Sequence, residues 1–170
     1  MSKIRFTEPN REILARRDSI INDLTRLVDP AGLITSTDEC RAYETDALTA
    51  YRKMPLAVVL PKTTEEVSAV LKYCHDTGVK VVPRGAGTSL AGGAIPSEDA
   101  VVLGLSKMNR VLAVNYDDRF IRVEAGVTNL SVTAVVAENG FFYAPDPSSQ
   151  LACTIGGNIA NNSGGAHCLK

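Results

Sequence analysis

The sequence contains few of the residues from which metal sites and disulfide frameworks are built. Its 170 residues include two histidines and four cysteines, and no two cysteines form a C-x-x-C pair. This spacing predicts neither a zinc site nor a compact disulfide framework, and it favours reduced thiols in a cytosolic protein. The length favours one domain with its own core.

Excess charge and long apolar runs are also missing. The formal net charge is −1, so no basic surface points to nucleic acid. No apolar run approaches the roughly 18 residues of a membrane helix. Acidic and polar residues follow Met1–Arg5 in place of the apolar core of a secretory signal.

Glycine is concentrated in two stretches, and the first is Val82–Gly93, VPRGAGTSLAGG. Its four glycines, with no bulky side chain before Leu90, predict a turn in which the backbone approaches a ligand closely. Successive N–H groups in such a turn form a concave nest for an anion, above all a phosphate. The hydroxyls of Thr88 and Ser89 add donors, and Arg84 adds a fixed positive charge.

Two familiar phosphate loops are excluded for this stretch. A Walker A loop requires a Gly-Lys-Ser/Thr ending, which is missing. A Rossmann fingerprint requires glycine at its sixth position, which Leu90 occupies. An ordinary glycine-rich connection is the alternative for this stretch taken alone.

The second stretch comprises Pro145–Ser149 and Cys153–Gly165 and is rich in Gly, Asn, Ser and Thr. These residues tolerate positive φ or supply short hydrogen bonds. Two such stretches in one small chain suggest a long ligand held from two sides. For the asparagines, bonds within their own loop are the favoured alternative.

Hydrophobic periodicity predicts a parallel α/β lobe in the first part of the chain. A strand, a capped helix and a second strand with short connections predict a βαβ unit, so that the first glycine loop leaves the carboxyl end of a strand. We expect the first helix to pack on a neighbouring domain or subunit. The predicted elements are an amphipathic helix over Pro9–Val28, an irregular segment over Thr35–Met54, a strand over Leu56–Leu60, a helix capped by Thr63 with Glu66 and stopped by Gly78, and strands over Val79–Val82 and Ala100–Leu103.

The second part of the chain predicts an antiparallel α+β lobe, which makes the whole chain α+β. Val111–Tyr116 and Phe120–Glu124 predict a hairpin, and a helix begins at Thr128 or Asn129 and runs through Glu138. Phe141–Tyr143 is assigned to the core. His75, in the last turn of the earlier helix, is assigned to the helix dipole.

Four motifs in this order resemble the FAD-binding, PCMH-type domain of the vanillyl-alcohol oxidase superfamily. They are Pro83–Gly93, Glu124–Gly126, Pro145–Ser149 and Thr154–Gly165. The nearest branch is that of the D-2-hydroxy-acid dehydrogenases, which includes the glycolate oxidase flavoprotein subunit and FAD-linked D-lactate dehydrogenase. The resemblance implies a lead-in segment over residues 1–54 and, over residues 55–170, an FAD-binding domain that is incomplete at its C-terminus. It places FAD between the two lobes.

The resemblance also implies which residues contact FAD. Some superfamily members attach FAD through a histidine at the position of Thr88, so the resemblance implies non-covalent FAD here. Tyr43 and Asp46 match a Tyr and an Asp of the family, although a surface loop with satisfied polar groups is favoured over a catalytic role. His167 is either an acid or base near the flavin or a solvated residue, and no catalytic residue or metal ligand is assigned. The implied contacts are Pro83, Arg84, Gly85, Ala86, Gly87, Thr88, Ser89, Leu90, Pro147, Ser148, Thr154, Gly156, Gly157, Asn158, Ala160, Ser163 and Gly164.

By resemblance, the parent protein oxidises a D-2-hydroxy acid such as glycolate or D-lactate to the 2-oxo acid. A further domain would bind the substrate, so the isolated chain is expected to be inactive. The resemblance implies a sister flavoprotein subunit, an iron–sulfur subunit and a cytoplasmic location, peripheral at the inner membrane through partners. The alternatives are another enzyme of the superfamily, such as an enolpyruvyl-sugar reductase or an ether-lipid synthase, and a non-catalytic flavin-binding or assembly module.

Overall fold

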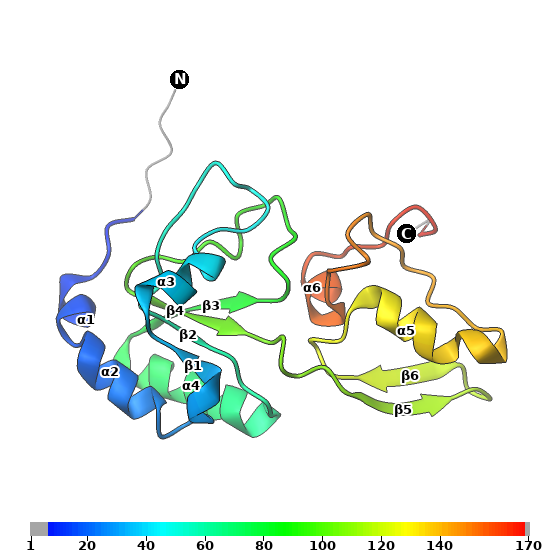
Figure 1. Cartoon of the computed structure of the whole chain (residues 1–170), viewed down its shortest axis with the longest axis horizontal. Coiled ribbons are helices and arrows are strands. Elements are labelled where there is room, and N and C mark those ends of the chain that lie inside the picture. The colour runs from blue at the N-terminus through cyan, green and yellow to red at the C-terminus, as the bar shows by residue number, and fades with distance from the viewer. Residues whose placement is uncertain (1–6, 169–170) are drawn as a thin grey trace.

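The chain forms two lobes joined by one connection, as seen in the computed structural model (Figure 1). The structure describes residues 7–168, and the predicted character of Met1–Arg5 lies outside them. The first lobe holds a mostly parallel sheet with helices, and the second holds an antiparallel hairpin with helices. The predicted α+β architecture, a parallel lobe followed by an antiparallel one, is confirmed.

The sheet of the first lobe has the strand order β1-β2-β4-β3. Strands β2 (Ala57–Val59), β4 (Ala100–Gly104) and β3 (Lys80–Arg84) are parallel, and β1 (Leu33–Ile34) is antiparallel to β2. The predicted parallel βαβ unit is present, and β4 is inserted between its two strands β2 and β3. Both of these strands bond to the fully buried β4.

Strands β2 and β4 are covered on both faces, which explains their unbroken apolar sequences. Successive side chains of a strand point to opposite faces. Ala57 and Val59 pack with the helices α1 (Arg11–Ala15), α2 (Arg17–Leu24) and α4 (Thr64–Thr77). Val58 instead packs with Cys40, at the end of α3 (Thr37–Cys40), and with Tyr43, at the end of the 3₁₀ turn η2 (Arg41–Tyr43).

The N-terminal helix differs from its prediction in three ways. It is interrupted at Arg16 (φ −97°, ψ 9°), and its α-helical part ends at Leu24, before Val28. The expectation that it packs on a neighbouring domain or subunit is wrong. Ile13, Ile20 and Leu24 are buried in this chain's own core, because their helical spacing places them on one face.

The ends of α4 follow the predicted signals, with one change. Thr63 Oγ1 accepts from the Glu66 amide at 3.2 Å, but the Glu66 carboxylate accepts from the Lys62 amide at 2.6 Å, so the reciprocal half of the capping box is not formed. Gly78 ends the helix at φ 74°, and its N–H bonds the Cys74 and His75 carbonyls. His75 lies in the last turn as predicted.

The segment predicted to be irregular, Thr35–Met54, is more ordered than expected. It contains α3, capped by Ser36, and η2, and it follows the 3₁₀ turn η1 (Pro30–Gly32) and β1. Asp46 is 4% exposed, its Oδ1 accepts from the Leu48 amide at 2.8 Å, and its Oδ2 has no partner among the described residues. A surface loop with satisfied polar groups is therefore the wrong description of Asp46.

A buried carboxylate ties the N-terminal segment to the sheet. Asp99 is 1% exposed and accepts hydrogen bonds from Lys80 Nζ and the Asn10 amide, both at 2.8 Å, and from Ser97 Oγ at 2.6 Å. Burial works to raise the pKa of Asp99, but these donors outweigh it and lower the pKa to about 2. Asp99 is therefore a charged anchor of the first lobe at neutral pH.

We expect Asp99 to make the stability of the chain fall in acid. A carboxylate with a lowered folded-state pKa stabilises the fold above its unfolded pKa, and this contribution is lost as the pH falls from about 4 toward 2. The shift corresponds to about 2 kcal/mol. Urea unfolding of the chain and of the Asp99→Asn variant across this range measures it. Equal slopes of stability against pH in the two chains would contradict the assignment.

The second lobe is built on a hairpin of β5 (Val111–Asn115) and β6 (Phe120–Val123). Helix α5 (Asn129–Val136) is followed by the 3₁₀ turn η3 (Ala137–Asn139) and by Gly140 at φ 76°. These elements confirm the predicted hairpin and helix. The assignment of Phe141–Tyr143 to the core is wrong for Phe142, which is 71% exposed, whereas Phe141 is half-buried against Tyr116.

Helix α6 (Ile155–Ala160) lies within the second glycine stretch, which was predicted only as a loop. Thr154 caps it by accepting from the Gly157 amide at 3.3 Å. Among residues 7–168, no helix has both the length and the apolar character needed to span a bilayer.

Candidate functional site

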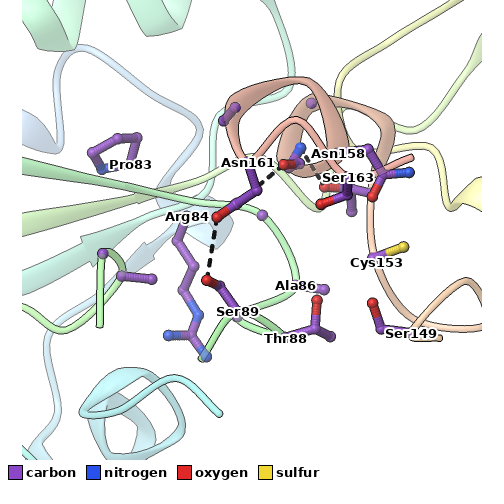
Figure 2. A pocket seen from close by; sticks show the side chains of 18 of the residues that line it. Pro83, Arg84, Ala86, Thr88, Ser89, Ser149, Cys153, Asn158, Asn161 and Ser163 are labelled. Atoms are coloured by element: carbon purple, nitrogen blue, oxygen red, sulfur yellow. Dashed lines mark hydrogen bonds between the residues drawn. The ribbon is translucent and has the colours of Figure 1, made fainter. Parts of the chain in front are cut away.

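The two glycine stretches border one cavity of about 730 Å³ between the lobes. It opens beyond the carboxyl ends of β3 and β4, where α/β sheets commonly bind ligands. Figure 2 shows Thr88 and Ser89 of the first stretch and Asn158 and Ser163 of the second around this space. The predicted residues that line it are Pro83, Arg84, Gly85, Ala86, Gly87, Thr88, Ser89, Leu90, Thr154, Gly156, Gly157, Asn158, Ala160 and Ser163.

Three predicted residues do not line the cavity. Pro147 and Ser148 form a turn in which the Gln150 amide bonds the Pro147 carbonyl at 2.8 Å, so that Ser149 reaches the cavity instead. The carbonyl of Gly164 accepts from the Asp146 amide at 2.9 Å. Pro147, Ser148 and Gly164 thus shape the outer side of the second stretch.

The two stretches touch where their glycines meet. A Cβ on Gly85 would lie 2.6 Å from Thr154 Oγ1 and 3.7 Å from Gly157 Cα. Any side chain at position 85 would therefore push the two walls apart. Glycine is required here by close approach of two backbones.

A side-chain bridge also joins the stretches (Figure 2). Ser89 Oγ donates to Asn161 Oδ1 at 3.2 Å, and Asn161 Nδ2 donates to the Gly157 carbonyl at 3.1 Å. The Asn161 side chain therefore bonds within its own loop, as predicted for the asparagines. It also bonds Ser89 of the first stretch. The two walls are connected before any ligand is considered.

Asn158 lies in the cavity wall with an unused donor. It is 5% exposed, and its backbone carbonyl accepts from the Ser163 amide at 2.8 Å. Its side-chain Nδ2 is buried and has no partner within the described part of the chain. A buried donor without a partner is costly, and a ligand acceptor would satisfy it.

Close packing positions α6 against the second lobe. A Cβ on Gly156 would lie 2.9 Å from Ala125 Cβ, and the Gly156 amide bonds the Ala125 carbonyl at 2.9 Å. Next to Ala125, the Glu124 carboxylate accepts from Arg110 Nη2 at 2.8 Å. The hydrogen bonds from the Arg110 side chain and backbone hold the pKa of Glu124 below its usual range.

His167 is outside the cavity lining. Its Nδ1 lies 2.6 Å from Asp146 Oδ2, and its amide donates to Asp146 Oδ1 at 3.0 Å. These bonds from the His167 amide and then its ring lower the pKa of Asp146. In this structure His167 fastens the end of the second stretch to the loop that contains Asp146.

The structure adds lining residues that the sequence reasoning missed. Adjacent strand ends could have indicated Leu105, which directly follows β4 beside the end of β3. Ala125 lies inside the Glu124–Gly126 motif, and Asn161 lies inside the second glycine stretch. The added residues are Gly93, Ala94, Leu105, Ala125, Ser149, Cys153 and Asn161.

The possible metal ligands and thiols of the described residues are scattered. Residues 7–168 contain no group of three His, Cys, Asp or Glu side chains placed to hold a metal. The four cysteines are free, and burial raises the pKa of Cys74 to about 11. Cys74 is therefore a protonated core residue at neutral pH.

The FAD binding domain family matches residues 55–170, a range that contains both glycine stretches. The chain belongs to this family. FAD is thus the cofactor of the domain, and the predicted resemblance is confirmed.

Two curated relatives align with most of this chain. Glycolate oxidase subunit GlcD of Escherichia coli (strain K12) is 48% identical over 154 residues, which cover 91% of this chain and 31% of that protein. D-lactate dehydrogenase of Archaeoglobus fulgidus is 38% identical over 153 residues, which cover 89% of this chain and 33% of that protein. The chain thus spans about a third of the length of these curated relatives.

Solved structures support the fold. An alkyldihydroxyacetonephosphate synthase superposes with a TM-score of 0.77 at 20% identity, covering 93% of this chain and 30% of that one. At this identity the likeness establishes the architecture alone.

The residues of the cavity fit FAD. Arg84 is the only charged residue among those that line it, so no carboxylate repels a diphosphate. Gly85 and Gly156 allow close packing on Thr154 and Ala125 around the cavity, and Asn158 Nδ2 offers a donor to a polar ring or chain. The cavity volume lies within the usual range of roughly 300–1,000 Å³ for ligand sites.

Proposed function

We propose that this chain is the FAD-binding portion of a flavin-dependent oxidoreductase that oxidises a D-2-hydroxy acid to the 2-oxo acid. FAD, when bound, would supply the redox chemistry as the two-electron acceptor of the hydroxy acid. The names of the relatives, glycolate oxidase subunit and D-lactate dehydrogenase, support this substrate class.

The observation that carries the proposal is the meeting of the two glycine stretches at Gly85 and Gly157 around one cavity. The backbone amides of residues 84–90 hold the diphosphate, assisted by the Thr88 hydroxyl, while the Ser89 hydroxyl joins the two stretches through Asn161. Residues 154–163 hold the flavin and ribityl end, with the Asn158 amide as donor. Each charge-assisted bond contributes roughly 1.5–3 kcal/mol.

FAD is held without a covalent bond in this proposal. Thr88 stands where some superfamily members have the histidine that attaches the cofactor, and a threonine hydroxyl is not such a nucleophile at neutral pH. The role of the chain is to bind and orient the cofactor.

The parent enzyme works with further parts. The word "subunit" in the name of the glycolate oxidase relative supports an assembly, and we propose a sister flavoprotein subunit and an iron–sulfur subunit. The assembly is cytoplasmic or peripheral at the inner membrane. Substrate binding resides in a separate domain, and the 170-residue chain has no turnover alone.

The test has two parts. Purified chain titrated with FAD is expected to quench flavin fluorescence at a stoichiometry of one, and acid precipitation is expected to release all the flavin into the supernatant. The longer parent protein is expected to lose its visible flavin absorbance on anaerobic addition of glycolate or D-lactate, and not on addition of L-lactate. Failure of the chain to bind FAD, flavin retained in the pellet, or bleaching by L-lactate alone would each contradict the corresponding part.

A further inference from the structure

The guanidinium of Arg84 faces the segment that precedes β2. Arg84 Nη1 donates a 2.7 Å hydrogen bond to the Thr45 carbonyl, and Cζ lies 5.5 Å from the centre of the Tyr43 ring. Figure 2 shows the Arg84 side chain pointing away from Asn158 and Ser163. The positive charge of Arg84, which the sequence analysis assigned to the ligand, therefore interacts with the protein itself.

Gly87 rests directly on this guanidinium. Its φ is +73°, and a Cβ at this position would lie 2.5 Å from Arg84 Cζ and 3.1 Å from Nε. The planar guanidinium thus lies directly beneath a residue of the glycine loop that has positive φ. No space is left between guanidinium and backbone for even a methyl group.

The same preceding segment holds the loop at two further points. We name Tyr43–Leu48 the support segment. Its Ala47 amide donates to the Ser89 carbonyl at 3.1 Å, and Leu48 Cδ2 would lie 3.4 Å from a Cβ on Gly92. The buried Asp46 carboxylate fixes the turn of the segment by accepting from the Leu48 amide.

We propose that Arg84 is a positioning residue, which sets the conformation of the glycine loop from the support segment and does not itself neutralise the cofactor's phosphates. The proposal rests on the proposed function, because the loop that Arg84 sets is the one assigned to the diphosphate. It makes the support segment, which lies outside the matched family range, a part of the cofactor-binding apparatus.

Lysine cannot replace arginine in this role. A guanidinium is flat and presents several donors in a fixed plane, so it can bond Thr45, cover the Tyr43 ring and underlie Gly87 at once. An ammonium keeps the charge but offers a single rotating head with no flat surface. Conversely, a residue that only neutralises a phosphate is replaced well by lysine. The Arg84→Lys variant therefore separates the two roles.

The experiment compares the unsubstituted 170-residue chain, Arg84→Lys, and a matched control, Arg41→Lys. Arg41 lies on the adjacent η2 turn with its side chain 67% exposed. Hydrogen exchange is measured at the amides of residues 85–89 without ligand, and the FAD dissociation constant is measured at two salt concentrations. Far-UV circular dichroism checks that each variant is folded, and Tyr43→Leu serves as a second variant that removes the ring without touching the arginine.

For Arg84→Lys we expect faster exchange of the loop amides in the ligand-free chain and FAD binding weakened about tenfold or more, with an unchanged salt dependence. Tyr43→Leu is expected to do the same more weakly, and Arg41→Lys to do neither. Loop exchange equal to that of the unsubstituted chain, or FAD affinity kept by lysine, would overturn the proposal. If the unsubstituted chain binds no FAD while Arg84→Lys still loosens the loop, the proposed function fails and the positioning role survives.

Discussion

We expect Gly87→Val to weaken FAD binding by the chain at least about 100-fold, since a β-branched residue at positive φ adds strain of 1–3 kcal/mol or more. Gly87 has φ +73°, and its missing side chain is the space that the Arg84 guanidinium fills. Valine would have to displace this guanidinium or move the loop away from the diphosphate. Fluorescence titration with FAD measures the loss.

Gly78→Ala is the matched control for backbone strain. Gly78 has φ +74°, nearly the same as Gly87, but nothing lies within 4 Å of its missing Cβ, and it ends α4 outside the cavity lining. Its variant should lose about 1 kcal/mol of stability and keep its FAD affinity. A Gly87→Val chain that binds FAD as tightly as the Gly78→Ala chain would contradict the role of the first glycine loop.

The second large effect is expected in folding. We expect Gly126→Ala to lower the free energy of unfolding by about 3 kcal/mol or more, because overpacking against rigid backbone cannot relax easily. A Cβ there would overlap the Leu105 carbonyl oxygen and lie 2.7 Å from that of Met108. The Gly126 amide also bonds the Met108 carbonyl at 2.7 Å, in the connection between the lobes. Urea unfolding followed by circular dichroism gives the value.

Gly93→Ala is the control in the same unfolding assay, because it adds a methyl group without a steric clash. Gly93 has no positive φ and no atom within 4 Å of its missing Cβ, so the change should stay within about 0.5 kcal/mol. Comparable losses in Gly126→Ala and Gly93→Ala would mean that the contact with Leu105 and Met108 does not hold the lobes together.

Local signals in the sequence predicted most of the elements. The cap at Thr63 and the stop at Gly78 define α4, and the apolar run over Leu56–Leu60 gives β2, because each depends on neighbours a few residues away. Helix α6 escaped prediction because glycine has a low helix propensity. Gly156 in this helix packs closely on Ala125, which is a tertiary contact.

The backbone of the site could be predicted from the sequence better than its side chains could. The glycines predicted a close approach of the backbone to another group, and Gly85 makes such an approach to Thr154 and Gly157. The direction of the Arg84 side chain depends on its contacts with Tyr43 and Thr45, about 40 positions earlier in the chain. The spacing of hydrophobic residues along a sequence does not predict a contact between such distant positions. Burial of Asp46 was missed for the same reason, since polar residues are read as surface by default.

The place of β4 between β2 and β3 has a consequence for biosynthesis. Strands β2 and β3 are made before β4 and have no bond to each other, so a nascent chain cannot close its parallel sheet until Gly104 has left the ribosome. Until then both strands present open edges to chaperones and to other chains. The glycine loop, which lies between β3 and β4, is therefore synthesised before the sheet that anchors it exists.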